Sequence, residues 1–312
     1  MKIYKNKIKE NWIIDRLIKE WDNVYPEYYT NLPKKADIIW IIAPWLWKSV
    51  SKSDLKSKKV ICSIYHIDKK TYDYRDFYEL DNYVDEYHVI SNKTKKDLEL
   101  LTDKKITSIP FWVNQKNFYY IDEKIKLRER YGFESKDFIV GSFQRDTEGV
   151  DLISPKMIKG PDILIESLLK LRNDNQNLRV LIAGNRRQYV LQKLNEYQFE
   201  FKYFEMVDIN TLNNLYNILD LYLVTSRLEG GPQAILECSQ TKTKIMSTDV
   251  GVAPEILSRS ALFNLNNFDY DPNKLDVEHN FISSSKYTLP NGAKLFNNTV
   301  SYTHLRAHET VV

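Results

Sequence analysis

Two kinds of segment alternate along the whole chain of 312 residues: short runs of β-branched and aromatic residues, and longer stretches with apolar residues at helical spacing. This alternation predicts an α/β fold with parallel sheets. The expected strands are Lys2–Tyr4, Asp37–Ile42, Lys59–Tyr65, Glu86–Ile90, Lys105–Ile109, Phe138–Phe143, Arg179–Ala183, Lys202–Met206, Leu219–Thr225 and Lys244–Ser247. The expected helices are Asn11–Asp22, Thr94–Leu101, Pro161–Leu171, Gln188–Tyr197, Ile209–Ile218, one from Pro232 and a short one after Pro254.

The length of the chain predicts two domains, since 43% hydrophobic residues over 312 positions supply more than one core. The boundary is expected between Asn117 and Lys126. We therefore predict an N-terminal domain over residues 1–122 and a C-terminal domain over residues 123–299.

One strand–turn–helix segment carries the strongest chemical signal. The buried run Leu219–Thr225 leads into Ser226-Arg-Leu-Glu-Gly-Gly-Pro-Gln-Ala-Ile-Leu-Glu237. Gly230 and Gly231 let a ligand approach the backbone, and Pro232 suits the first helical turn. Because a helix N-terminus favours an anion, this turn predicts a phosphate site, with Glu229 and Glu237 placed to accept hydrogen bonds from sugar hydroxyls. An ordinary connector with two solvated glutamates is the alternative for such a segment alone.

A second turn, Lys159-Gly160-Pro161-Asp162, repeats that pattern at the start of another predicted helix. Lys159 and the helix N-terminus can converge on one diphosphate, and Arg145 can offer a bidentate guanidinium from the end of the preceding strand. The long loop between them weakens the prediction for Arg145, and Lys156 could share its role. Exposed surface cations are the alternative.

These segments together resemble the family 4 retaining glycosyltransferases. Glu229 and Glu237 match their Glu-x7-Glu signature, and Ser247-Thr-Asp-Val-Gly-Val-Ala-Pro-Glu-Ile-Leu257 matches the following strand, Gly turn and Pro-Glu helix start. Ser91 and Pro110-Phe-Trp-Val-Asn-Gln-Lys-Asn-Phe118 also fit, so the resemblance runs from about Lys59 to Leu257. It implies the GT-B fold: two Rossmann-like domains facing one another across a cleft, with the donor held mainly by the C-terminal domain.

The resemblance also implies residue roles. Arg145 and Lys159 would bind the donor pyrophosphate and stabilise the leaving group, Glu229 would hold the donor sugar without acting as a nucleophile, and Glu237 would hold the ribose. No Asp-x-Asp pair sits at a predicted strand end, and the implied transfer is metal-independent, with retention and no cofactor beyond the donor. The remaining donor-binding positions are Gly184, Gly230, Gly231, Pro232, Gln233 and Ala234.

His66 and a pair of arginines are less decided. His66 directly follows the predicted strand Lys59–Tyr65. Family members often have a histidine near this position that contacts the donor sugar or the acceptor, although a lone histidine is more often structural. We include it among the catalytic candidates. Arg186 and Arg187 follow Gly184, and we expect them on the surface rather than beside the base.

The N-terminal half is expected to select the acceptor, a glycan or a lipid-linked sugar. Trp45, Leu46 and Trp47, together with Lys48, Lys52, Lys56, Lys58 and Lys59, could touch anionic lipid headgroups. We favour the alternative of a solvated helix face with two core tryptophans. The net charge of +3 is too small to indicate nucleic acid.

Cys62 and Cys238 lack metal spacing and are expected as buried fillers in a reducing cytoplasm. No apolar run approaches the length of a membrane span, and no signal peptide is recognisable. Val300–Thr310 looks like a translated sequencing adapter, so His304 and His308 are excluded as metal ligands. The natural protein is expected to continue past Thr299.

The sequence thus predicts a cytoplasmic retaining hexosyltransferase that uses a nucleotide-diphospho-sugar, with peripheral membrane contact as an open alternative. From the family we expect a role in bacterial surface polysaccharide biosynthesis. Two alternatives stay open: a nucleotide-sugar epimerase of the same fold, and a non-catalytic scaffold that binds a sugar nucleotide or a glycan.

Overall fold

The computed structural model describes residues 1–6 and 13–299, and it divides into two compact units. Unit 1 comprises residues 1–112 together with the segment that starts at Tyr287, and unit 2 comprises Val113–Lys286. The expected start of the first helix at Asn11 and the adapter-like Val300–Thr310 lie outside the described residues.

The division differs from the predicted boundary at residues 122 and 123, because the connecting segment is bonded to unit 2. The backbone N–H groups of Tyr119 and Ile121 donate to the side-chain oxygens of Asn213 and Asn217, at 3.0 and 2.8 Å. The last predicted residues of the C-terminal domain, from Tyr287 onward, return to unit 1.

Unit 1 contains a five-stranded parallel sheet in the order β1-β2-β3-β4-β5. Its strands are β1 (Ile3–Lys5), β2 (Ile38–Ile41), β3 (Lys59–Ile64), β4 (Glu86–Val89) and β5 (Lys105–Ser108). Its helices are α1 (Ile13–Val24), α2 (Lys52–Ser57), α3 (Tyr74–Asp81) and α4 (Asn92–Leu98), with 3₁₀ turns at Pro26–Tyr28, Pro33–Lys35 and Pro44–Ser49.

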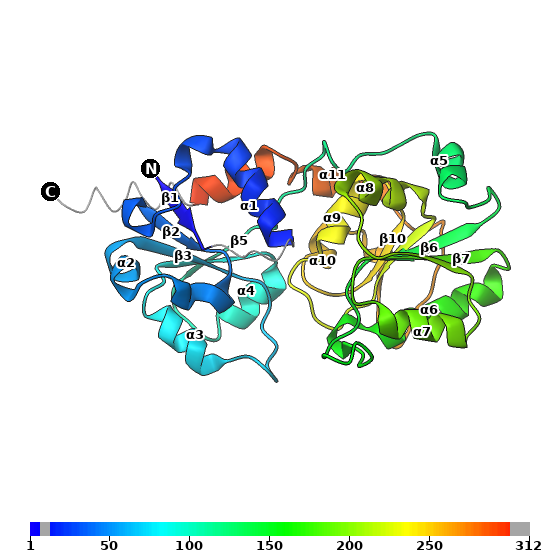
Figure 1. Cartoon of the computed structure of the whole chain (residues 1–312), viewed down its shortest axis with the longest axis horizontal. Coiled ribbons are helices and arrows are strands. Elements are labelled where there is room, and N and C mark those ends of the chain that lie inside the picture. The colour runs from blue at the N-terminus through cyan, green and yellow to red at the C-terminus, as the bar shows by residue number, and fades with distance from the viewer. Residues whose placement is uncertain (7–12, 300–312) are drawn as a thin grey trace. The chain divides into compact units, whose positions relative to one another are not determined.

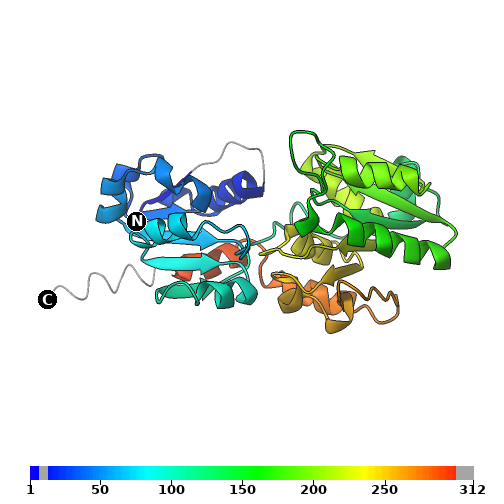
Figure 2. The same ribbon diagram turned by 90° about the horizontal axis from the view of Figure 1, so that it is seen from below.

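Alternation along the strands sends side chains to two separate cores, one on each face of this sheet. Ile39, Ile41 and Cys62 point toward α2, α3 and α4. Trp40 and Ile61 point to the opposite face, which α1 and the helical residues 291–299 cover (Figures 1 and 2).

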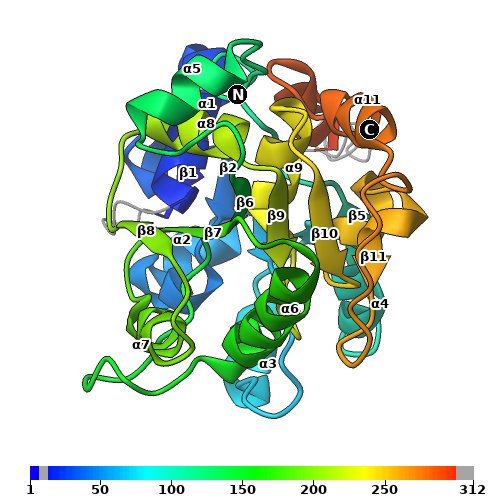
Figure 3. The ribbon, with the colours of Figure 1, turned by 90° about the vertical axis from the view of Figure 1, so that its right-hand side faces the viewer.

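Unit 2 contains a six-stranded parallel sheet in the order β11-β10-β9-β6-β7-β8 (Figure 3). Its strands are β6 (Phe138–Ser142), β7 (Leu178–Ala183), β8 (Phe201–Phe204), β9 (Leu221–Val224), β10 (Ile245–Thr248) and β11 (Leu262–Phe263). Its helices are α5 (Lys124–Arg130), α6 (Pro161–Asp174), α7 (Gln188–Glu196), α8 (Ile209–Ile218), α9 (Gln233–Gln240), α10 (Ala253–Ile256) and α11 (Val277–Ser285), with 3₁₀ turns at Met157–Lys159 and Arg259–Ala261.

The helices of unit 2 cover both faces of its sheet. Helices α6 and α7 lie side by side on one face, and α8 and α9 lie on the other (Figures 2 and 3). Because all strands are parallel, their carboxyl ends meet at one edge, which is where open α/β sheets bind ligands.

Each predicted strand has a counterpart in the structure, as does each predicted helix. The two-residue β11 and the helices α2, α3, α5, α11 and 291–299 were not predicted. Both cysteines are buried and unpaired, as expected. Across residues 1–6 and 13–299, no helix combines the length and apolar character that a membrane crossing needs.

Candidate functional site

The two turns singled out in the sequence meet in unit 2. Lys159 Nζ forms an ion pair with Glu229 Oε1, although the two residues are 70 positions apart. The Lys159 side chain is 22% exposed and the Glu229 side chain 12%, so the pair is reachable but largely screened from water. The two turns therefore meet within unit 2, and their role as one ligand site stays a prediction.

A glycine explains how closely the turns approach one another. Gly160 precedes α6 in the left-handed conformation, at φ 61° and ψ 45°. A Cβ at this position would lie 1.8 Å from the backbone oxygen of Thr225, at the end of β9. In addition, the Thr225 hydroxyl donates to the Gly160 carbonyl at 2.9 Å. Only glycine lets the start of α6 pack directly on the end of β9.

Gln144, which the sequence analysis missed, joins these elements. It lies just beyond β6, and its Nε2 donates to the Lys159 carbonyl at 2.7 Å. Its Oε1 lies 3.2 Å from the Ser226 hydroxyl, which is also 3.0 Å from Glu229 Oε1. Ser226 is fully buried. Gln144 could have been found from the sequence, because it directly precedes Arg145 at the carboxyl end of a predicted strand.

The glycine turn after Glu229 is held by the next loop. A Cβ on Gly251 would lie 2.1 Å from the Gly230 carbonyl oxygen, and Gly251 has a positive φ of 48°. Helix α9 begins at Gln233, with Pro232 at its N-cap, one residue later than predicted. Gln233 and Ala234 therefore occupy the first turn of α9, at the positive end of the helix dipole.

Glu237 lies deeper than a simple surface ligand. It is 4% exposed, and its Oε2 accepts a hydrogen bond from the Tyr216 hydroxyl at 2.8 Å. Burial and the nearby Glu237 carboxylate raise the pKa of Tyr216, so that hydroxyl stays protonated and donates. The structure thus fixes one oxygen of Glu237, and its role toward a ribose stays a prediction.

Further cations gather around Lys159. Burial and the charges of Lys159 and Arg145 lower the pKa of Lys156. Burial and the charge of Arg186 lower the pKa of Arg145, whose Nε donates to the Thr147 carbonyl at 3.1 Å. Positive charges close enough to shift one another's pKa favour an anion between them.

Arg187 is a correction to the sequence analysis. It was expected on the surface, but it is fully buried and forms an ion pair with buried Asp146. Its Nη1 also donates to the carbonyls of Ser142 and Ala183, at 2.5 and 2.8 Å. Arg187 thus anchors the loop after β6 to the ends of β6 and β7. Arg186 stays partly exposed, as expected.

The remaining predicted positions are placed as follows. Gly184 follows β7 with φ 92°, and its carbonyl accepts from the Tyr203 hydroxyl at 3.0 Å. His66 belongs to unit 1, where it is exposed after the end of β3. His66 thus belongs to a different unit from Lys159 and Glu229, and its role stays a prediction.

A different histidine of unit 1, His88 on β4, is buried. Its Nε2 donates to the Ile109 carbonyl at 2.8 Å, so its Nδ1 accepts from the Ser63 hydroxyl at 2.9 Å. Ser63 in turn accepts from Trp40 Nε1 at 2.9 Å. Burial lowers the pKa of His88 to about 4, which keeps this ring neutral and structural.

The basic and aromatic segment near Trp45 agrees only in part with each interpretation, a lipid-contacting surface or a solvated helix face with two core tryptophans. Trp47 is buried, whereas Trp45 is 48% exposed, so only one of the two tryptophans is in the core. Lys48 pairs with Asp76 and Glu79 of α3, and Lys52 also pairs with Glu79. These acidic partners neutralise much of the charge that a lipid surface would meet.

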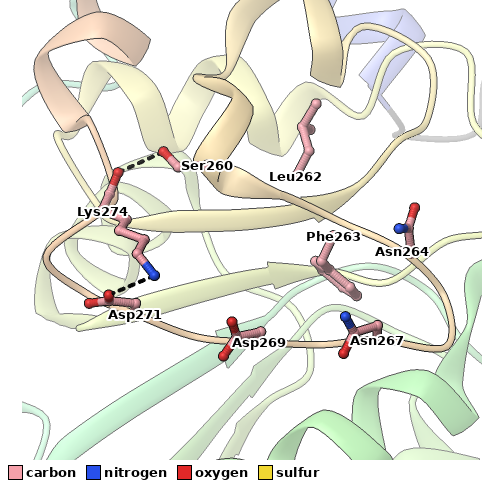
Figure 4. Close-up of a pocket in the computed structure, with 8 residues that line it drawn as sticks. All are labelled: Ser260, Leu262, Phe263, Asn264, Asn267, Asp269, Asp271 and Lys274. Atoms are coloured by element: carbon pink, nitrogen blue, oxygen red, sulfur yellow. Dashed lines mark hydrogen bonds and ion pairs between the residues drawn. The ribbon is translucent and has the colours of Figure 1, made fainter.

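A separate cavity of about 220 Å³ lies beside β11 (Figure 4). It is lined by Ser260, Leu262, Phe263, Asn264, Asn267, Asp269, Asp271 and Lys274, and by none of the predicted site residues. Asp271 pairs with Lys274 at 3.2 Å. Within the described ranges, no group of three His, Cys, Asp or Glu side chains is placed to hold a metal ion.

Comparison with known protein families finds a match within unit 2. Residues 152–269 match the sequence model of a family described as "Glycosyl transferases group 1". The match contains Lys159, Glu229 and Glu237 but begins after Arg145. A search of curated proteins found no match.

Solved structures match almost the whole chain at low identity. HepE of Anabaena, in complex with UDP and glucose, is 13% identical with a TM-score of 0.73, and the match covers 97% of this chain and 100% of HepE. A glycosyltransferase of Rickettsia africae is 20% identical with a TM-score of 0.64, covering 96% and 83% of the two chains. The lipopolysaccharide outer core galactosyltransferase WaaB is 13% identical with a TM-score of 0.65, covering 97% and 100%.

These matches confirm the predicted fold class. The chain has the α/β fold with two parallel sheets, and it matches structures of GT-B glycosyltransferases. The solved structures support the fold alone. The match to the glycosyltransferase family covers residues 152–269, a range that includes Lys159 and Glu229.

Proposed function

We propose that this protein is a retaining glycosyltransferase that transfers a hexose from a nucleotide-diphospho-sugar to a glycan or lipid-linked acceptor. The observation that carries the proposal is the contact between Lys159 and Glu229, which joins two helix-opening turns at the carboxyl edge of a parallel sheet. Both residues lie within the region that matches the glycosyltransferase family.

The proposed reaction breaks the bond between the anomeric carbon and the diphosphate oxygen and forms a bond to an acceptor oxygen on the same face. The acceptor proton passes to the departing phosphate. Lys159, Lys156 and Arg145 would stabilise the negative charge on that phosphate, together with the N-terminus of α9, without a metal ion. Glu229 would hold the sugar hydroxyls and Glu237 the ribose.

The class of donor and acceptor is supported by what related structures contain. HepE has been solved with UDP and with UDP-glucose, so a nucleotide sugar suits this fold. WaaB is named as a transferase of the lipopolysaccharide outer core, which agrees with a role in bacterial surface polysaccharide biosynthesis. A cytoplasmic location would give the enzyme access to nucleotide sugars.

The proposal is tested by incubating the purified protein with UDP-, GDP- and ADP-hexoses, with and without a lipid or glycan extract, and measuring the released nucleoside diphosphate. We expect release that depends on the acceptor. Donor conversion without an acceptor would indicate an epimerase, and binding without conversion would indicate a scaffold.

A variant assigns the activity to the proposed site. Glu229→Ala should lower the transfer rate on the order of 10²-fold, because the donor sugar loses a hydrogen-bond acceptor in the transition state. The variant should still bind the nucleoside diphosphate. Full transfer activity in Glu229→Ala would remove Glu229 from the site.

A further inference from the structure

The ion pair between Lys159 and Glu229 joins two residues with different proposed partners. Lys159 would bind the diphosphate, and Glu229 would bind the sugar, yet in this structure each neutralises the other. The Lys159 side chain is only 22% exposed and the Glu229 side chain only 12%. Separating the two charges is therefore costly, because bulk water cannot fully solvate either of them.

The carboxylate of Glu229 is also held from a second side. The buried Ser226 hydroxyl donates its one proton at 3.0 Å to the same Oε1 atom that contacts Lys159, because the charged carboxylate is a stronger and closer acceptor than Gln144 Oε1 at 3.2 Å. Glu229 is therefore fixed beside the ammonium rather than resting there by chance.

A nucleoside diphosphate without a sugar must compete with Glu229 for the Lys159 ammonium. If its phosphate takes the Lys159 ammonium, Glu229 loses its cation while a second anion arrives next to it. The phosphate and the Glu229 carboxylate are both negative and repel one another, and the carboxylate gains no new hydrogen bond or cation in return. A nucleotide sugar differs because its hydroxyls can donate to Glu229 when Lys159 turns to the phosphate.

From this arrangement we propose that the Lys159–Glu229 pair makes the site selective for the sugar-bearing nucleotide over the sugar-free nucleoside diphosphate. This inference rests on the proposed function. Once the sugar has been transferred, Glu229 has no hydroxyl to bind and recovers Lys159, which weakens the hold on the leaving diphosphate. Glu229 thus determines substrate selectivity and promotes product release.

The test is the affinity of Glu229→Gln, measured by calorimetry with UDP, GDP and ADP and with the corresponding glucose nucleotides. The amide keeps the shape of the side chain but leaves Lys159 available to phosphate. We expect the preferred nucleoside diphosphate to bind about three- to tenfold tighter than in the unmodified protein. The nucleotide sugar should gain no affinity, so the selectivity between the two ligands falls.

A matched control comes from helix α6, which follows Lys159. Asp162 forms a two-point ion pair with Arg227, at 2.8 and 2.6 Å, at the start of α6. Asp162→Asn makes the same change in net charge as Glu229→Gln and also removes the carboxylate partner of a cation, Arg227. Its effect on nucleoside diphosphate affinity should be smaller than that of Glu229→Gln, and an equal effect would overturn the inference.

A double variant separates the ion pair from simple repulsion. In Lys159→Ala the substitution Glu229→Gln should no longer tighten binding, because no ammonium remains to be released. A gain that persists without Lys159 contradicts the inference. If the unmodified protein binds none of the nucleotides, the proposed function fails. If it binds them and Glu229→Gln brings no gain, the inference alone fails.

Discussion

The two units share one architecture but differ at the carboxyl ends of their strands. In unit 1 these ends carry structural groups: Ser91 is a fully buried N-cap of α4. In unit 2 they carry Gly160 and Gly230 beside Lys159 and Glu229. The core patterns produce similar sheets in both units, and the residues that follow the strands decide whether an edge can bind an anion.

The polar networks of the two units show the same contrast. In unit 1 the chain from Trp40 through Ser63 to His88 ends on the Ile109 carbonyl, inside the core. In unit 2 the buried Ser226 hydroxyl donates to Glu229, which belongs to the partly exposed pair of Glu229 and Lys159. A network that ends within the core stabilises the fold, whereas one that ends at a reachable ion pair can serve a ligand.

The largest expected effect concerns the segment that returns to unit 1. Phe296 packs against Trp40, with ring centroids 4.2 Å apart, and is almost fully buried. Phe296→Ala should destabilise unit 1 by about 3–5 kcal/mol, because a ring-sized cavity opens in its core.

Tryptophan fluorescence during urea unfolding measures this effect selectively, since all six tryptophans lie between residues 1 and 112. Leu295→Ala, at a residue that is 41% exposed, is the matched control and should change little. Equal losses in both variants would show that the segment does not complete the core of unit 1.

The next effect concerns the site in unit 2. Lys159→Ala should lower the transfer rate by on the order of 10²–10³ and weaken nucleoside diphosphate binding, because the leaving group loses its nearest cation. Transfer kinetics and calorimetry measure both changes. Lys170→Ala removes an exposed cation from helix α6, which follows Lys159, and should have almost no effect. Comparable losses in the two variants would reduce Lys159 to a general surface charge.

The smallest effect is a pH dependence confined to unit 1. The pKa of His88 is lowered to about 4 in the folded protein, against an ordinary value of 6.5, because burial disfavours the charged ring. Between pH 6.5 and 4 the unfolded chain binds the additional proton, so the stability of unit 1 falls as the pH is lowered.

Urea unfolding followed by tryptophan fluorescence from pH 7 to 4 measures this loss. In His88→Gln the contribution of this residue is removed, and the stability should depend less on pH in that window. An unchanged dependence in the variant would assign the effect to carboxylates instead.

Local sequence patterns were sufficient for β1 to β10 and for the two glycine turns, but not for the two-residue β11. Buried strands read as apolar runs, and Lys159-Gly160 and Glu229-Gly230-Gly231 mark turns by their own composition. The pairing of Lys159 with Glu229 could be expected because both turns follow strands of one parallel sheet.

Long-range contacts were not predictable in this way. Arg187 looks like any surface arginine until the loop after β6 brings Asp146 to it. Residues 291–299 belong to unit 1 through Phe296, whose partners lie more than 200 positions earlier. Gln144 has a role only because two separate segments, the turn at Lys159 and the end of β9, converge on its amide.

The most direct test of the account is an experimental structure of the protein with the preferred nucleotide-diphospho-sugar bound. We predict that the diphosphate oxygens contact Lys159 Nζ and the first turn of α9, beside Gly230 and Gly231. A diphosphate bound in the cavity beside β11, or anywhere away from Lys159 and Glu229, would contradict the assignment of this site.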